Sequence, residues 1–111
     1  MNIRYRNNKL AKKLESAAAI KKNFGANAKR VSQRMEDIEA SPNLKILCSI
    51  PQANCHPLTN DRQGEWALDI SANHRIIFII DHHPIPMTAD GSIERIQVTD
   101  IQIITAQEDY H

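Results

Sequence analysis

The sequence predicts an α+β domain: a short N-terminal strand, a two-helix antiparallel hairpin, then an antiparallel sheet of three to four strands with the helices on one side. Apolar residues recur at helical spacing up to about residue 39, and strand-like alternation begins near residue 65. The length of 111 residues suits one hydrophobic core, so we expect a single domain over residues 1–111.

The N-terminal half is predicted to contain the short strand and both helices. Residues 2–6 alternate weakly, as in an edge strand. Helices are expected from Asn8 to Phe24 and from Asn27 to Glu39, each with one apolar face. These faces comprise Leu10, Leu14, Ala17, Ala18 and Phe24 in the first helix, and Ala28, Val31, Met35 and Ile38 in the second. Gly25 ends the first helix and Pro42 ends the second, and the short gap between them predicts an antiparallel hairpin.

The C-terminal half is predicted to form the sheet. Apolar and other residues alternate from Trp66 to Ile70, which indicates a half-buried strand. Residues 74–80 carry apolar side chains at both even and odd positions, as in a central strand covered on both faces. Residues 71–73 form the turn between them. Residues 82–92 are predicted to form a loop and residues 93–105 a further strand. The alternation of apolar residues slips between Val98 and Ile101, which indicates a bulge or a break there.

Charge is distributed very unevenly along the chain. Residues 1–34 carry ten Lys/Arg and one acid, for +9, whereas residues 35–111 carry four Lys/Arg and twelve acids, for −8. Such a basic half can face nucleic acid, because phosphate contacts supply most sequence-independent affinity. The same pattern also arises when two amphipathic helices expose Lys and Arg to solvent, and the sequence leaves both interpretations open.

The chain lacks membrane and secretion signals. Its longest apolar run is the five residues 76–80, and the N-terminus has no signal-peptide pattern, so a cytoplasmic protein is expected. Cys48 and Cys55 are then expected to be reduced thiols. With His56 they lack the paired spacing of a zinc site, and we expect no metal and no cofactor.

Two segments concentrate chemically active side chains. The block from His56 to Phe78 contains Arg62 and Arg75, and the chain ends in Asp109, Tyr110 and His111. Terminal residues usually fray, so this ending is useful only if it continues a docked strand. In that case its groups can meet His56 and the two arginines, forming a site with acid/base groups and anion-binding cations.

These two segments resemble the HigB-type toxins, or plasmid maintenance system killer proteins, of the RelE/ParE superfamily. The matching residues are His56, Leu58, Asp61, Arg62, Gly64, Trp66, Ile70, Arg75, Ile76, Phe78, Asp109, Tyr110 and His111. The helical hairpin and the chain length fit as well, so the resemblance covers nearly the whole chain. It implies a translation-inhibiting toxin that cuts mRNA in the ribosomal A site and is held inactive by a HigA-like helix-turn-helix antitoxin.

The resemblance assigns roles to the candidate residues. Metal-independent RNA cleavage requires removal of the 2′-OH proton, stabilisation of the phosphorane and protonation of the 5′-oxygen. His56 and His111 are the candidates for the proton transfers, Arg75 for binding the phosphate, Tyr110 for hydrogen bonding or base stacking, and Asp109 for orienting a neighbour. Arg62 is expected to hold its turn or to contact RNA. The candidates for contacting ribosomal RNA are Lys12, Lys13, Lys29 and Arg30.

Several positions differ from the family pattern. A family Lys is replaced by Thr59, a Gly by Asn60 and an aromatic by His74, and a strand cation is absent at Asp69 and Ile70. Fewer cations predict weaker binding of phosphate. Two alternatives therefore stay open: a ParE-like inhibitor of DNA gyrase, against which the Tyr-His ending argues, and a catalytically inactive member that binds only antitoxin or DNA.

Overall fold

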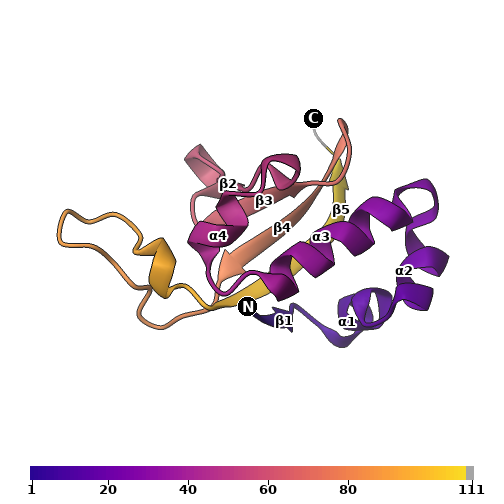
Figure 1. Ribbon diagram of the computed structural model, residues 1–111, viewed down its shortest axis with the longest axis horizontal. Coiled ribbons are helices and arrows are strands. Elements are labelled where there is room, and N and C mark those ends of the chain that lie inside the picture. The colour runs from indigo at the N-terminus through magenta and orange to yellow at the C-terminus, as the bar shows by residue number, and fades with distance from the viewer. Residues whose placement is uncertain (110–111) are drawn as a thin grey trace.

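A five-stranded sheet with helices on one face forms the core of the structure, a computed structural model (Figure 1). It describes residues 1–109, Asp109 by its backbone alone, so the predicted site residues Tyr110 and His111 lie outside the described residues. The strands are β1 (Asn2–Tyr5), β2 (His56–Pro57), β3 (Glu65–Asp69), β4 (His74–Ile80) and β5 (Asp100–Asp109). The helices are α1 (Asn8–Leu14), α2 (Ala17–Phe24), α3 (Ala28–Ala40) and α4 (Leu44–Cys48), with short 3₁₀ turns at Gly25–Asn27, Pro51–Ala53, Asn60–Arg62 and Arg95–Gln97.

The sheet confirms the predicted α+β class. Its strand order is β1-β5-β4-β3-β2, so β1 is an edge strand and β4 is central, both as predicted. Strands β2 to β5 pair antiparallel, whereas β1 pairs parallel with β5. The sheet is therefore mixed, a detail that the prediction of an antiparallel sheet missed. Parallel neighbours need a long connection, and here nearly the whole chain provides it.

The helical hairpin is confirmed with one correction. The single helix predicted over residues 8–24 is two helices, because Ser16 adopts an extended backbone (φ −149°, ψ 158°) between them. Its hydroxyl accepts a hydrogen bond from the Ala19 N–H at 3.1 Å, as an N-cap does. The apolar spacing continues across this break, so periodicity alone did not reveal it. Helix α4, capped by Asn43, was not predicted.

The last strand begins later than predicted. Residues 95–97 form a 3₁₀ turn, and Val98 is buried beside it before β5 starts at Asp100. The irregularity predicted between Val98 and Ile101 is therefore a break before the strand rather than a bulge within it. The register shifts lie further along, where residues 103–108 of β5 pair with residues 75–78 of β4.

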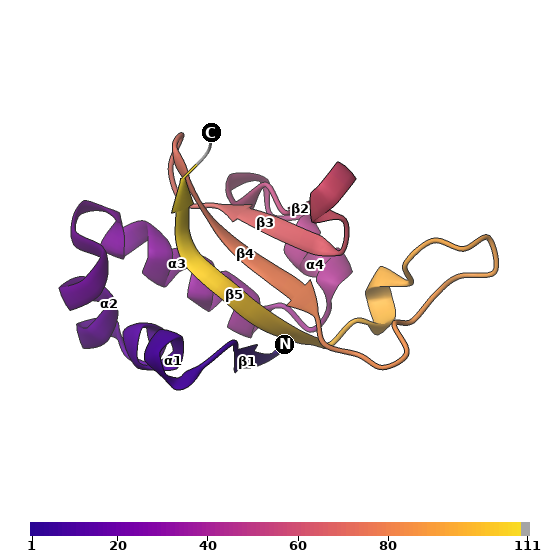
Figure 2. The ribbon, with the colours of Figure 1, turned by 180° about the vertical axis from the view of Figure 1, so that it is seen from behind.

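The core lies between the helices and the sheet. The sheet contributes Trp66, Leu68, Ile70, Ile76, Phe78, Ile80, Ile101, Ile103 and Ala106, and the helices contribute Leu14, Ile20, Phe24, Val31, Met35, Ile38, Leu44 and Leu47. Figure 2 shows the opposite face of the sheet, which the helices leave open, and the long loop of residues 82–99 that projects from one end. None of the helices within residues 1–109 is long and apolar enough to cross a membrane.

Candidate functional site

Four charged side chains form a connected cluster across the sheet: Arg62, Glu65, Arg75 and Glu108. Arg62 donates to both carboxylate oxygens of Glu108, through Nη1 and Nη2, at 2.9 Å each. Arg75 donates to the Oε2 atom of the same carboxylate, at 2.8 Å from Nε and 2.7 Å from Nη2. Arg75 flanks the core residue Ile76, so alternation directs it to the open face of the sheet. The charged cluster therefore lies on the face that the helices leave uncovered.

The charged cluster includes a second carboxylate, that of Glu65. The Nη2 and Nε atoms of Arg62 lie 2.6 and 3.2 Å from Oε1 of Glu65. Hydrogen bonds from Arg62, and then from Arg75, hold the pKa of Glu108 below its usual value. The bonds to Glu108 and Glu65 in turn raise the pKa of Arg62. Two cations and two carboxylates cancel, so the charged cluster is formally neutral.

Local backbone geometry places Arg62 over the sheet. Arg62 ends the 3₁₀ turn Asn60–Arg62, which begins with Asn60 in the left-handed region at φ 60°. Asn is among the residues that tolerate this conformation best, which explains why it can replace the glycine of the family pattern. Gly64, at φ 96°, then returns the chain into β3. Arg75 and Glu108 meet because they are cross-strand partners of β4 and β5.

His56 lies on the open face of the sheet, on the edge strand β2. It pairs with Ala67, which pairs with Ile77, two residues from Arg75 on β4. Two strand spacings separate His56 from β4, about 10 Å. Its Nδ1 lies 2.6 Å from the carbonyl oxygen of Asn54, an acceptor only, so the neutral imidazole carries its proton on Nδ1. That tautomer leaves Nε2 as the proton-accepting nitrogen.

Asp69, one of the departures from the family pattern, has a structural role. Its carboxylate accepts from Nδ2 of Asn54 at 2.9 Å, and its carbonyl accepts from Nε of Arg34 at 2.8 Å. Arg34 also donates to the Gln52 carbonyl at 3.0 Å and is buried. These bonds fix the segment that leads into His56. Arg34 is thus one cation of the basic half that belongs to the interior rather than to a nucleic-acid surface.

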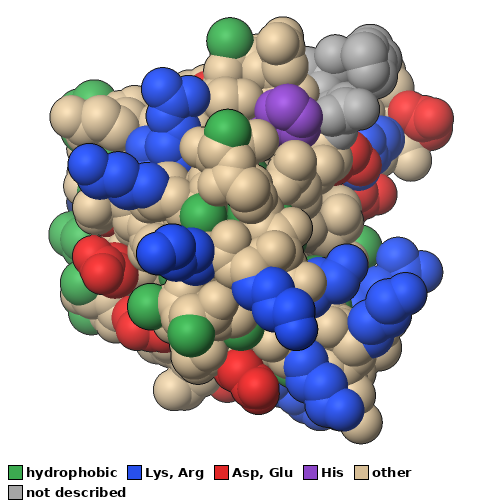
Figure 3. Space-filling view, turned by 90° about the vertical axis from the view of Figure 1, so that its right-hand side faces the viewer, with side chains coloured by type: hydrophobic (Ala, Val, Ile, Leu, Met, Phe, Trp, Pro, Cys, Tyr) green, Lys and Arg blue, Asp and Glu red, His purple; other side chains and the backbone are tan. Residues whose placement is uncertain are grey.

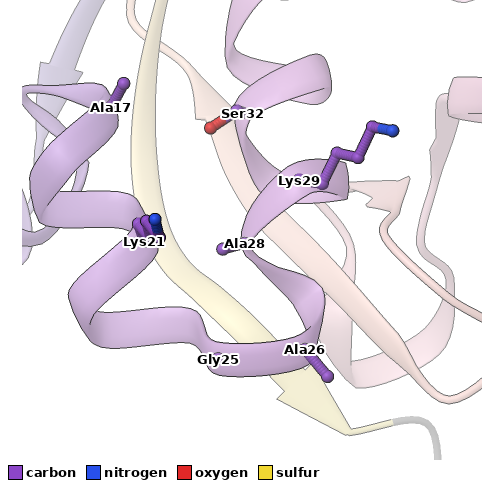
Figure 4. A pocket seen from close by; sticks show the side chains of 7 residues that line it. All are labelled: Ala17, Lys21, Gly25, Ala26, Ala28, Lys29 and Ser32. Carbon is purple, nitrogen blue, oxygen red and sulfur yellow. The ribbon is translucent and has the colours of Figure 1, made fainter.

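The other predicted RNA contacts lie on the helices, away from the charged cluster. Figure 3 shows Lys and Arg side chains gathered at the end of the molecule where α1 and α2 lie. Lys13 lines a hollow of about 390 Å³ between the start of α1 and β5, together with Arg6 and Lys9. Lys29 lines a different hollow, of about 400 Å³, between α2 and α3 (Figure 4). Lys12 and Arg30 are exposed on α1 and α3.

The two carboxylates of the charged cluster, Glu65 and Glu108, were not among the residues predicted from the sequence. Glu108 stands beside the Asp-Tyr-His ending, and only the pairing register shows that it faces Arg75. Asp109 pairs through its backbone with His74, so β5 continues to the level of Arg75, as the docked-strand hypothesis requires. The Asp109 side chain, Tyr110 and His111 lie outside the description. Among the described side chains, those of residues 1–108, no group of three or more His, Cys, Asp or Glu is arranged to hold a metal.

Comparisons with known proteins define the fold. Neither a protein-family model nor a curated protein matches the sequence. A YoeB/ParE toxin from Agrobacterium tumefaciens is similar in structure, with a TM-score of 0.54 and 12% sequence identity over 99% of this chain and 100% of that one. The YoeB dimer from Staphylococcus aureus is also similar in structure, with a TM-score of 0.52 and 15% sequence identity over 99% of this chain and 98% of that one. The chain therefore has the fold of these YoeB/ParE toxins.

Proposed function

We propose that this protein is the toxin of a type II toxin–antitoxin system. In this proposal it is a HigB-type, ribosome-dependent mRNA endonuclease that acts in the cytoplasm, and a HigA-like helix-turn-helix antitoxin neutralises it. The observation that carries the proposal is the convergence of two arginines on one carboxylate, on the open face of a sheet with the fold of YoeB/ParE toxins. That face is the natural place for a bound RNA strand, because the helices cover the other one.

The charged cluster supports a role in phosphate binding. Carboxylate and phosphate oxygens accept the paired N–H groups of guanidinium in the same way, so a site that holds Glu108 also suits a phosphate. In the proposed mechanism the scissile phosphate takes the position of the Glu108 carboxylate between Arg62 and Arg75. The two guanidinium groups then stabilise the charge that develops on the phosphorane. No metal ion is needed in this mechanism.

The proton transfers are assigned to histidines. Nε2 of His56 accepts the 2′-OH proton in one assignment, and His111 protonates the 5′-oxygen; the reverse assignment uses the same groups. The roles of Tyr110, in hydrogen bonding or stacking, and of Asp109, in orienting a neighbour, come from the resemblance to HigB-type toxins. The basic side chains of α1 and α3 contact ribosomal RNA in this proposal, with Lys12, Lys13, Lys29 and Arg30 as the candidates.

The test is translation of a defined mRNA in a purified ribosome system, with mapping of 5′ ends by primer extension. The expected result is cleavage within codons only when ribosomes are present. Arg75→Gln and His111→Ala should lower the cleavage rate by about 10²-fold or more, in line with loss of one preorganised catalytic group. Lys45→Gln is the matched control for the arginine variant, because Lys45 is exposed on α4, which packs on the covered side of the sheet. It should cleave like the wild type.

Two other outcomes would overturn the proposal. Intact mRNA together with inhibited DNA supercoiling by gyrase would establish the ParE-like alternative. Intact mRNA, active gyrase and normal growth on overexpression would identify an inactive member that binds only antitoxin or DNA. Full cleavage by both site variants would leave the endonuclease activity in place but refute the assignment of Arg75 and His111.

A further inference from the structure

A pair of thiols lies outside the charged cluster and has no part in the proposed function. The sulfurs of Cys48 and Cys55 are 3.3 Å apart, and both cysteines are free and partly buried. Cys48 ends α4, and Cys55 directly precedes His56 at the start of β2. A disulfide bond requires sulfurs about 2.05 Å apart, so an approach of little more than 1 Å separates the thiols from a bond.

The intervening segment is held in place independently of the sulfurs. Ala53 is fully buried, and Ile50 packs against the core. Asn54 adopts a left-handed backbone (φ 45°, ψ 48°) that turns the chain back towards α4, and its side chain is bound to Asp69. The two thiols are therefore brought together by the fold, and closing the bond requires no rearrangement of the sheet.

The surroundings make the two thiols unequal. The hydrogen bond with Cys55, together with the nearby Arg95 guanidinium, lowers the pKa of Cys48 to about 7. Arg95 is itself held in place, with its Cζ atom 5.0 Å from the centre of the buried Trp66 ring. The pKa of Cys55 is raised, mainly by the same hydrogen bond with Cys48 and secondly by burial of the Cys55 thiol. Because the thiolate is the attacking species, Cys48 is the nucleophile and Cys55 the resolving thiol.

We propose that Cys48 and Cys55 are a redox modification site that forms a reversible intramolecular disulfide by exchange with small-molecule disulfides. The Cys48 thiolate attacks one sulfur of the small disulfide, breaks its S–S bond and releases one thiolate. Cys55 then loses its proton and attacks the Cys48 sulfur, which expels the second small thiolate. The two cysteines lose two electrons, and the small disulfide gains them as two thiols. The bond ties the segment that carries His56 to α4, whether or not the protein is an endonuclease.

The test is titration of the full-length reduced protein with glutathione buffers of increasing oxidised fraction, followed by acid quenching, alkylation and intact mass measurement. The wild type should lose the mass of two hydrogens and become resistant to alkylation at both cysteines. Cys55→Ser should stop at a single mixed disulfide with glutathione on Cys48, whereas Cys48→Ser should form no comparable adduct. Addition of dithiothreitol should restore both thiols.

The rate of the first step is a second measurement. At pH 7 a thiol with a pKa near 7 is about half ionised, against roughly 3% for an ordinary thiol, but its lower basicity reduces its nucleophilicity about fivefold. Cys48 should therefore react about threefold faster than an unperturbed thiol. Arg95→Gln should remove part of that advantage and leave the end point unchanged, because the hydrogen bond with Cys55 is the larger cause of the lowered pKa of Cys48. Mixed disulfides on both cysteines of the wild type, or no oxidation at any ratio, would overturn the proposal even if the protein cleaves mRNA.

Discussion

Replacing Arg34 with Met is expected to lower the free energy of unfolding by about 3–5 kcal/mol, because it breaks a buried ion pair from one side. Arg34 is 8% exposed, and its guanidinium donates to the Asp37 carboxylate at 2.8 Å and to the carbonyls of Asp69 and Gln52. Met keeps the aliphatic stem but removes the guanidinium from all three acceptors, of which the Asp37 carboxylate keeps the hydrogen bond from Nε2 of Gln33 at 3.0 Å. Single hydrogen bonds to a charged group contribute about 1.5–3 kcal/mol and are not additive in a network, which gives the same range.

The measurement is urea denaturation at pH 7. With a slope of about 2 kcal/mol/M, the midpoint of Arg34→Met should fall by about 1.5–2.5 M. Arg30→Met, which removes an exposed cation from the same helix, should stay within about 0.5 kcal/mol of the wild type. A loss below about 1 kcal/mol for Arg34→Met would refute the reasoning, because the three acceptors would then be satisfied without the guanidinium.

Two further substitutions test the charged cluster and its turn. The depressed pKa of Glu108 contributes stability that is fully present above the unfolded-state value of 4.5 and is lost as the pH falls through the lower folded-state value. Glu108→Gln should therefore be less stable than the wild type at neutral pH and should lose less stability below pH 4.5, as measured by denaturation across the acid range; parallel curves would contradict this. Gly64→Ala should cost about 1–2 kcal/mol from the positive φ alone, since an added Cβ meets nothing within 4 Å, and an unchanged thermal midpoint would show that the turn relaxes.

The sequence predicted those parts of the fold that depend on local pattern. The second helix, the central strand around Phe78 and the edge position of β1 all follow from periodicity and length. The parallel pairing of β1 with β5 does not, because it joins residues nearly 100 positions apart. The break at Ser16 was missed for a different reason: the apolar face continues through it, and only the cap geometry interrupts the helix.

Part of the charged cluster could be identified from the sequence, and part could not. Arg62 and Arg75 were identified through the resemblance, but their convergence on Glu108 depends on the shifted register of β4 and β5, which periodicity does not encode. The burial of Arg34 could not be predicted from the charge pattern. Its place among ten basic residues indicated a cation exposed to nucleic acid or to solvent, whereas its burial follows from the position of the Asp69 and Gln52 carbonyls at the ends of other elements.

The position of β5 between β1 and β4 has a consequence for synthesis of the protein. Translation proceeds from β1 to β5, so β1 has no partner and β4 lacks one of its two until residues 100–109 have been made. The pairing of β1 with β5 must close a loop of almost the whole chain, the kind of contact that slows folding. The helical hairpin and the β3–β4 hairpin form local contacts and can assemble on the nascent chain, whereas the Arg75–Glu108 contact appears only when β5 inserts. The two arginines therefore meet Glu108 on the open face only after the rest of the charged cluster has been synthesised.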